Sequence, residues 1–234
     1  MDGTGLMFEP FVQAASGFES RVVRYPTELT SYPDCIAFAR TTLPTDQPFL
    51  LLGESFSGPV AIALGAERPA GLMGLVLCST FVRNPRPEWA WLAPLLRLLP
   101  PLNPPLPLLQ RLLLGKHPPQ ALADLALAML PQVPSATLKQ RLLAVVQVDH
   151  THLLAQIKVP VLALCASHDR LVPPSATAWI REHLGPLDIA TLNGPHWILQ
   201  TRPETAVLVI EAFLRRIQPA VETIPEESAT NQHG

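Results

Sequence analysis

The chain has few charged side chains and no cluster of positive ones. Charged residues make up 15% of the 234 residues, and the formal net charge is −2. Surfaces that bind nucleic acids carry clustered Lys and Arg, because the phosphate charges must be neutralised. The sequence therefore predicts no nucleic-acid partner.

Cysteine is scarce as well. Cys35, Cys78 and Cys165 are far apart in the sequence, and no paired Cys or His pattern typical of a metal site is present. Such spacing is typical of buried free thiols in a reducing compartment. We expect three free thiols, no metal and no cofactor.

The chain also lacks a recognisable leader and an uninterrupted apolar span. Its first residues, Met1 to Leu6, contain no basic segment and no apolar run of the kind found in signal peptides. The most apolar stretch, residues 91–114, is interrupted by Arg97, Arg111 and several prolines. A membrane span needs about 20 apolar residues in continuous helix. We therefore expect a cytoplasmic protein with no integral membrane segment, leaving open an association with lipid surfaces.

What the sequence does contain is an alternation of strand-like and helix-like segments, in a chain long enough for one α/β domain with an insertion. This alternation predicts a mostly parallel sheet with helices on both faces. The predicted strands are residues 21–25, 49–52, 72–78, 159–165 and 189–192. The predicted helices are residues 6–15, 32–42, 56–68, 175–183 and 203–217.

The alternation is interrupted between residues 84 and 150, where Leu, Ala and Pro dominate with helical spacing. One apolar face is predicted at Leu122, Leu125, Ala126 and Met129, and another at Leu138, Leu142, Val145 and Val146. The organisation that follows is an α/β core in two parts (1–83 and 151–217), a helical cap insertion (84–150) and a disordered tail (218–234).

The most informative motif is the corner at Ser55. An apolar run ends at Gly53, Ser55 follows, and a helical pattern begins at Phe56. A tight strand-to-helix turn exposes a serine hydroxyl where a base can reach it, and it needs small residues on both sides. Gly53 supplies one, and Ser57 stands where a second glycine is usual, followed by Gly58.

A serine nucleophile needs a base and a group that orients the base. Asp169 and His196 each follow a predicted strand and are the candidates. Asp169 could instead cap the helix near Pro173, and His196 could be a loop histidine bound to backbone. His168 competes for the role of base, but it is adjacent to Asp169, which makes an orienting bond between them difficult.

Other polar residues near these motifs have plainer interpretations. We expect Asp149, His150 and His152 to be solvated or hinge residues at the end of the insertion. Glu54, beside the serine, is interpreted as structural, while Phe56 matters through its backbone amide.

With serine, acid and histidine in this order after strands, residues 1–217 resemble the α/β-hydrolase superfamily, and small capped esterases such as the pimeloyl acyl-carrier-protein methyl ester esterases in particular. The resemblance implies Ser55 as nucleophile, Asp169 as acid and His196 as base. It also implies two backbone donors for an oxyanion: the amide of Phe56, and the amide of Met1 or of nearby Asp2.

In this superfamily the loop that resembles Met1–Leu6 follows a central strand of the sheet. The resemblance therefore implies that amino-terminal strands are missing from the sequence given, which would make it a truncated form. The expected consequence is a gap, or direct pairing, between the predicted strands at residues 21–25 and 49–52.

The leading functional hypothesis is a serine hydrolase that cleaves a small, hydrophobic carboxylic ester through an acyl-enzyme. One alternative is an acyltransferase, because residues 2–5 also resemble phytyl ester synthase relatives. Another is a non-catalytic binding protein with the hydrolase fold. Dehalogenase and epoxide hydrolase chemistry is disfavoured, because those relatives carry an aspartate where this chain has Ser55.

Overall fold

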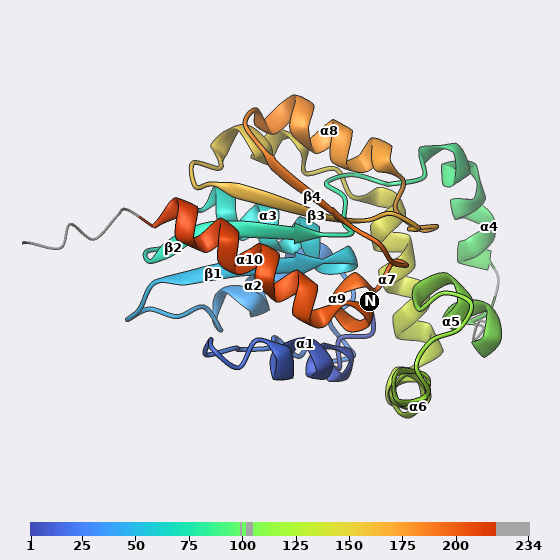
Figure 1. The fold of residues 1–234 in the computed structure, drawn as a ribbon. Coiled ribbons are helices and arrows are strands. Elements are labelled where there is room, and N and C mark those ends of the chain that lie inside the picture. The colour runs from blue at the N-terminus through green and yellow to red at the C-terminus, as the bar shows by residue number, and fades with distance from the viewer. Residues whose placement is uncertain (99, 102–104, 219–234) are drawn as a thin grey trace, which may run out of the picture.

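A computed structural model describes residues 1–98, 100–101 and 105–218 of the chain. Its centre is a four-stranded sheet in the order β1-β2-β3-β4, in which each neighbouring pair is parallel (Figure 1). The strands are β1 (Phe49–Glu54), β2 (Leu72–Cys78), β3 (Val161–Ala166) and β4 (Asp188–Leu192). The predicted parallel sheet is confirmed.

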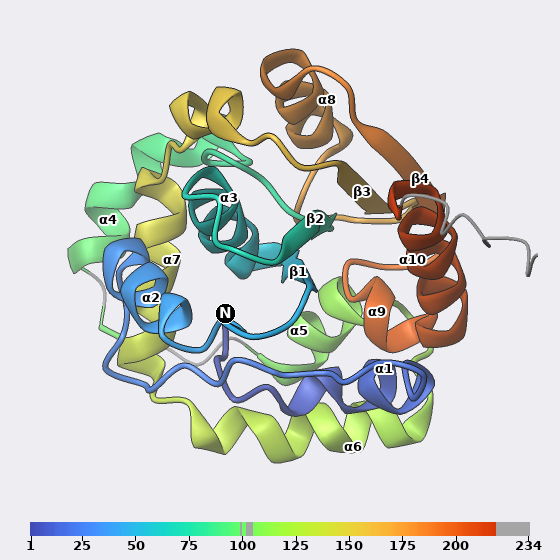
Figure 2. The same ribbon diagram turned by 90° about the vertical axis from the view of Figure 1, so that its left-hand side faces the viewer.

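Helices cover both faces of this sheet, as the alternation predicted (Figure 2). Helices α3 (Gly58–Ala66) and α8 (Pro174–Leu184) lie on one face, and α10 (Pro203–Ile217) lies on the other with α1 (Glu9–Ala14) beside it. The core is correspondingly divided into apolar clusters on the two sides. One contains Ile62, Leu75, Leu77 and Ile180, and another contains Val76, Leu162, Ile210 and Phe213.

The bounds of the helices follow from local signals. Helix α2 (Tyr32–Arg40) begins after Ser31, whose hydroxyl accepts a hydrogen bond from the Asp34 amide. Helix α10 has Pro203 in its first turn and two arginines in its last turn, where a proline is tolerated and positive charge is favoured. These signals place both helices close to their predicted bounds.

Between β2 and β3 the chain is helical, and these helices gather beyond the carboxyl ends of the strands (Figure 1). They are α4 (Ala93–Leu98), α5 (Leu106–Leu113), α6 (Gln120–Met129) and α7 (Ser135–Gln147), with short 3-10 turns at Pro87–Leu92, Leu130–Gln132 and Thr151–Gln156. An antiparallel bridge between Arg83 and Asp149 joins the two ends of this segment. The division into core, cap and tail stays a prediction, and residues 219–234 of the predicted tail lie outside the described residues.

The two predicted apolar faces of this segment differ in outcome. On α6, Leu122, Ala126 and Met129 are buried as expected. On α7 the prediction is partly wrong, because Leu142 is exposed while Arg141 and Leu143 are buried. The buried face of α7 includes Arg141, whose guanidinium donates hydrogen bonds to backbone carbonyls of the amino-terminal loop. These hydrogen bonds, and not the apolar spacing alone, determine which side of the helix is buried.

The predicted strand at residues 21–25 is wrong. These residues belong to no sheet, and the Tyr25 amide donates to the Gly3 carbonyl at 2.8 Å instead. The physical reason is that, among the described residues, no strand lies within pairing distance. In this part of the chain β1 pairs only with β2, and its other side faces a cavity of about 1200 Å³ that residues 18–25 line from across the gap. Of the two expected outcomes, a gap or direct pairing, the structure has the gap.

Two further expectations concern thiols and membranes. All three cysteines are free; Cys35 and Cys78 are buried, whereas Cys165 is only partly buried. In the described part of the chain, no single helix is long and apolar enough to cross a membrane. The bent pair Gln120–Gln132 and Ser135–Gln147 meets that test by length and composition only.

Candidate active site

Ser55 lies at the corner between β1 and a 3-10 turn (Ser55–Ser57) that leads into α3. Its φ is 51°, a left-handed conformation that costs a non-glycine residue on the order of 1–3 kcal/mol. The corner is crowded: a Cβ on Gly53 would lie 2.7 Å from the Ala61 Cβ, and one on Gly58 would lie 1.8 Å from the Thr80 Oγ1. Both glycines are therefore required by close packing.

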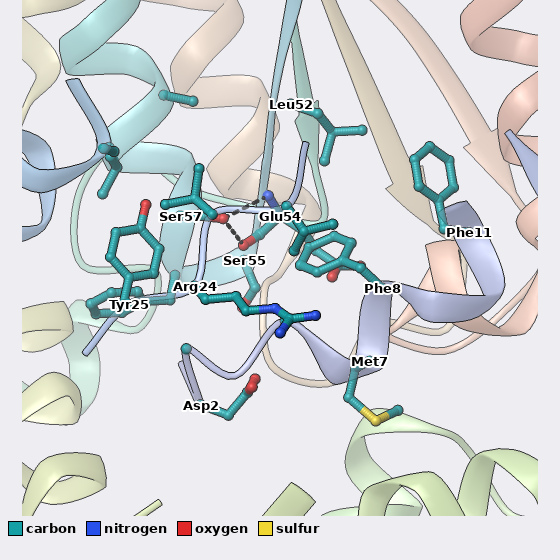
Figure 3. A pocket seen from close by; sticks show the side chains of 18 of the residues that line it. Asp2, Met7, Phe8, Phe11, Arg24, Tyr25, Leu52, Glu54, Ser55 and Ser57 are labelled. Carbon is teal, nitrogen blue, oxygen red and sulfur yellow. Dashed lines mark hydrogen bonds between the residues drawn. The ribbon is translucent and has the colours of Figure 1, made fainter. Parts of the chain in front are cut away.

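Ser57 does more than replace a small residue. Its hydroxyl accepts a hydrogen bond from the Glu54 amide at 3.0 Å and donates to the Glu54 carbonyl at 2.8 Å, as the dashed lines in Figure 3 mark. The Thr80 hydroxyl donates to the Ser55 carbonyl at 2.5 Å. Side-chain bonds on both flanks of Ser55 thus hold the strained turn.

The three residues predicted from sequence lie together. His196 Nε2 is 2.8 Å from Ser55 Oγ, and His196 Nδ1 is 2.7 Å from Asp169 Oδ2. The side chains of His196 and Asp169 are 1% and 6% exposed. A neutral imidazole that carries its proton on Nδ1 donates to Asp169 and accepts from the Ser55 hydroxyl.

Asp169 serves its own loop as well. Its Oδ1 accepts hydrogen bonds from the amides of Leu171 and Val172, both at 2.9 Å, while Oδ2 faces His196. The loop-capping alternative and the orienting role are therefore compatible. His168 is exposed, and its ring contacts the Ser167 hydroxyl at 2.9 Å.

The two predicted backbone donors differ in their surroundings. Phe56 is buried in the first turn after Ser55, where helical amides lack partners of their own, and its ring stacks on Tyr32 with centroids 4.8 Å apart. Met1 as a residue is 40% exposed, but desolvation of its amine lowers the pKa of that group. Met1 and Asp2 line the same cavity as Ser55, Phe56 and His196.

Sequence reasoning missed Arg141, which holds this amino-terminal loop in place. It is fully buried on α7, and its guanidinium donates to the carbonyls of Met1 and Asp2, each at 2.8 Å. The same group also donates to the carbonyls of Pro26 and Leu29, at 2.8 and 3.0 Å. An arginine inside a helical, Leu-rich segment gives little signal of this role, because its partners are backbone groups more than 100 positions away.

The polar residues at the end of the insertion lie elsewhere. Asp149 accepts from the Thr151 amide at 2.9 Å, and His152 is exposed. His150 Nδ1 is 3.2 Å from the Pro59 carbonyl, and burial lowers the pKa of this histidine. None of these three lines the cavity at Ser55 within the described part of the chain.

The cavity at Ser55 is large and mostly apolar (Figure 3). It extends from Ser55 and His196 along the unpaired side of β1 to Gln47, between that strand and residues 18–25. Its apolar lining includes Phe8, Phe11, Val23, Leu50, Leu52 and Leu142. Among the described residues, no group of three or more His, Cys, Asp or Glu is placed to hold a metal ion.

Comparison with known proteins shows which family the chain belongs to. A sequence model described as "Serine aminopeptidase, S33", an α/β-hydrolase family, matches residues 27–193, which is more than half of the chain. The chain belongs to this family. This hydrolase is accordingly an enzyme of the α/β-hydrolase superfamily, as its motifs predicted. A search of curated proteins found none that matches it.

Solved structures agree on the fold. A hydrolase from Pseudomonas aeruginosa PA01 is similar with a TM-score of 0.72 and 20% identity, over 91% of this chain and 86% of that one. A thermophilic esterase from Thermogutta terrifontis (malate bound) has a TM-score of 0.70 and 19% identity, over 92% and 87%. An esterase from Exiguobacterium antarcticum has a TM-score of 0.70 and 14% identity, over 91% and 88%. The α/β-hydrolase fold predicted from sequence is thus confirmed.

Proposed function

We propose that this hydrolase cleaves carboxylic esters through an acyl-enzyme formed on Ser55. The observation that carries the proposal is the continuous hydrogen-bond chain from Asp169 through His196 to Ser55, at 2.7 and 2.8 Å. Its two ends lie on separate elements, the corner after β1 and the loop after β3. A chance arrangement of the three groups at bonding distance, inside a hydrolase fold, is a weaker explanation.

The roles follow from the chemistry of each group. His196 takes the proton of Ser55 as Oγ attacks the carbonyl carbon, and it returns that proton to the leaving alcohol as the acyl-enzyme forms. Water then attacks the acyl carbon, with His196 accepting a water proton and passing it to Ser55 as the acid is released. Asp169 keeps the imidazole oriented and stabilises its positive charge.

The developing oxyanion needs fixed donors, each worth about 100-fold or more in rate. We assign the amide of Phe56 as one donor, because it follows the nucleophile at the start of a helical turn. The second is assigned to the backbone nitrogen of Met1 or Asp2, whose carbonyls are held by the Arg141 guanidinium.

For the substrate we propose a small-molecule ester with a hydrophobic acyl group. The support is the apolar lining of the cavity that Ser55 also lines. A cytoplasmic location fits the three free thiols, which are typical of reducing compartments. The acyltransferase alternative uses the same residues and differs only in the acceptor of the acyl group.

The test is turnover of a p-nitrophenyl ester together with labelling by a fluorophosphonate probe. Ser55→Ala should lose turnover by several orders of magnitude and take up no label. Ser175→Ala, an exposed serine on α8, is the matched control and should behave as the parent. If the probe labels the parent protein at a residue other than Ser55, the assignment of Ser55 is contradicted. If folded parent protein takes up no label, a non-catalytic binding protein is favoured.

Product analysis then separates hydrolysis from transfer. With water and a primary alcohol offered together, we expect the free acid as the main product. A new ester as the main product, at millimolar alcohol, would identify an acyltransferase instead.

A further inference from the structure

A buried polar pair lies directly beside the nucleophile and is not used in the proposed reaction. Glu54 is the last residue of β1 and precedes Ser55, and its side chain is near Ser55 and Ser57 in Figure 3. Gln200 lies on α9 (Ile198–Thr201), four residues after His196. The two residues are 7% and 2% exposed, and Gln200 Nε2 donates to Glu54 Oε2 at 2.9 Å. The pair therefore joins the corner that carries the serine to the segment that carries the histidine.

Each partner leaves one oxygen unsatisfied. Glu54 Oε1 and Gln200 Oε1 are both buried and have no hydrogen-bond partner among the described residues. With an ionised carboxylate, both atoms are acceptors, so neither satisfies the other and a charge stays buried. One proton on Glu54 Oε1 makes it a donor, and Gln200 Oε1 is then its natural acceptor. A carboxylic acid and a primary amide can make two such bonds at once.

The electrostatic surroundings favour the protonated form of Glu54. Burial raises the pKa of Glu54 to about 7, although the Gln200 bond, His196 and the Met1 amine each favour the ionised form. Asp2 acts in the other direction, and Cys78 is a further titratable group that interacts with Glu54. The carboxyl is thus held neutral up to about neutral pH.

We propose that Glu54 is protonated in the working enzyme and forms a two-bond acid–amide pair with Gln200, which positions Ser55 relative to His196. This inference rests on the proposed function of Ser55 and His196. Glu54 is a positioning residue, because it acts through the backbone of Ser55 and does not contact the reacting atoms. Loss of its proton breaks one of the two bonds and places a negative charge near the imidazole.

Protonation of Glu54 should also make the stability of the folded protein depend on pH. The folded pKa of Glu54 lies above its ordinary value of 4.5, so the folded state binds more protons between pH 4.5 and about 7. Its contribution is complete below pH 4.5, falls as the pH rises through this window, and is gone above about 7. A glutamine at position 54 keeps both bonds, because two amides pair in the same way, and it cannot ionise.

The experiment compares the full chain with Glu54→Gln, and uses Glu182→Gln, an exposed carboxyl on α8, as the matched control. Urea unfolding from pH 4.5 to 8.5 needs no turnover. The stability of Glu54→Gln relative to the parent should rise between pH 4.5 and 7 and stay constant above that, while Glu182→Gln tracks the parent. A difference that does not change with pH would overturn the proposal, whatever the activity.

The second measurement is kcat/KM for a p-nitrophenyl ester over the same pH range. Glu54→Gln should match the parent near pH 6 and exceed it several-fold near pH 8, and Glu54→Ala should be slower at every pH. A Glu54→Gln variant that is slower than the parent by the same factor at every pH would show that ionisation of Glu54 does not affect turnover, and the proposal would fail. If Ser55→Ala keeps its activity while the unfolding result holds, the proposed function fails and the acid–amide pair stands.

Discussion

At the scale of single residues, the corner at Ser55 depends on neighbouring glycines that have no side chain. Gly58 has no room for a methyl group, since a Cβ there would lie 1.8 Å from Thr80 Oγ1 and 2.6 Å from the Thr80 Cβ. The same threonine hydroxyl holds the Ser55 carbonyl. Packing against α3 and orientation of Ser55 therefore use the same side chain.

Gly58→Ala should consequently lower both stability and turnover. Overpacking of this kind costs about 1–3 kcal/mol, and the displaced Thr80 releases the Ser55 carbonyl. Urea unfolding and kcat for a p-nitrophenyl ester would measure the two effects. Gly17→Ala is the control, because a Cβ at Gly17 meets nothing within 4 Å. Equal behaviour of the two variants would contradict the packing argument.

Arg141 is the second residue whose role is set by its surroundings. Its buried guanidinium serves four backbone carbonyls, two of which belong to the loop proposed to complete the oxyanion site. Burial lowers the pKa of this arginine, which still stays charged at neutral pH. Backbone oxygens thus take the place of a carboxylate partner.

Arg141→Met should destabilise the fold by at least about 3 kcal/mol, because several buried carbonyls lose their donor together. Arg141→Lys should recover only part of this loss, since an ammonium cannot reach carbonyls on several sides of a planar fork. Arg181→Met, at an exposed position of α8, is the control. Thermal or urea unfolding gives the comparison, and an Arg141→Lys variant as stable as the parent would refute the fork geometry.

At the scale of elements, helices with strong end signals were predictable and isolated extended segments were not. Helix α10 was predicted with its observed bounds, because Pro203, the arginines of its last turn and its apolar spacing agree. Residues 21–25 have the composition of a strand, yet strand formation needs a neighbour to accept and donate hydrogen bonds. Propensity describes the segment alone, so the absent partner could not be read from it.

The candidate site likewise contains residues that could be predicted from the sequence and residues that could not. The corner at Ser55, Asp169 and His196 could be found because each follows a strand, and parallel strands end at one edge of the sheet. Gln200 and Arg141 could not, because a short helix after His196 and an arginine in an apolar helix carry no motif. Their importance arises only when distant backbone and side chains are brought within bonding distance.

Helix α10 itself allows a prediction about packing. Phe213 is 2% exposed and packs against Val76, Leu162 and Ile210, whereas Leu208 on the same helix is 62% exposed. Phe213→Ala should lose about 3–5 kcal/mol of unfolding free energy, and Leu208→Ala should stay within about 0.5 kcal/mol of the parent. Chemical denaturation measures both, and a similar loss in the two variants would contradict the assigned face.

At the scale of the whole molecule, the apolar cavity connects the sheet edge, the amino-terminal loop and the inserted helices. It is lined by β1, by residues 18–25, by α7 and by Ser55. A ligand that enters it from the serine meets apolar side chains on several sides. Acyl groups of different length should therefore be distinguished by how much of the cavity they fill.

We expect kcat/KM for p-nitrophenyl esters to rise with acyl length from two carbons upward. Burial of one methylene is worth about 0.8 kcal/mol, which limits the rise to about fourfold per carbon. Leu142 is partly exposed but also lines the cavity, so Leu142→Trp should reduce this rise for long esters and leave the acetate ester unchanged. Leu127→Trp places the same ring on an exposed part of α6 outside the cavity lining and should leave the whole series unchanged. A chain-length profile that Leu142→Trp does not alter, in folded protein, would mean that the acyl group takes a different path from Ser55, and the hydrophobic-substrate proposal would lose its support.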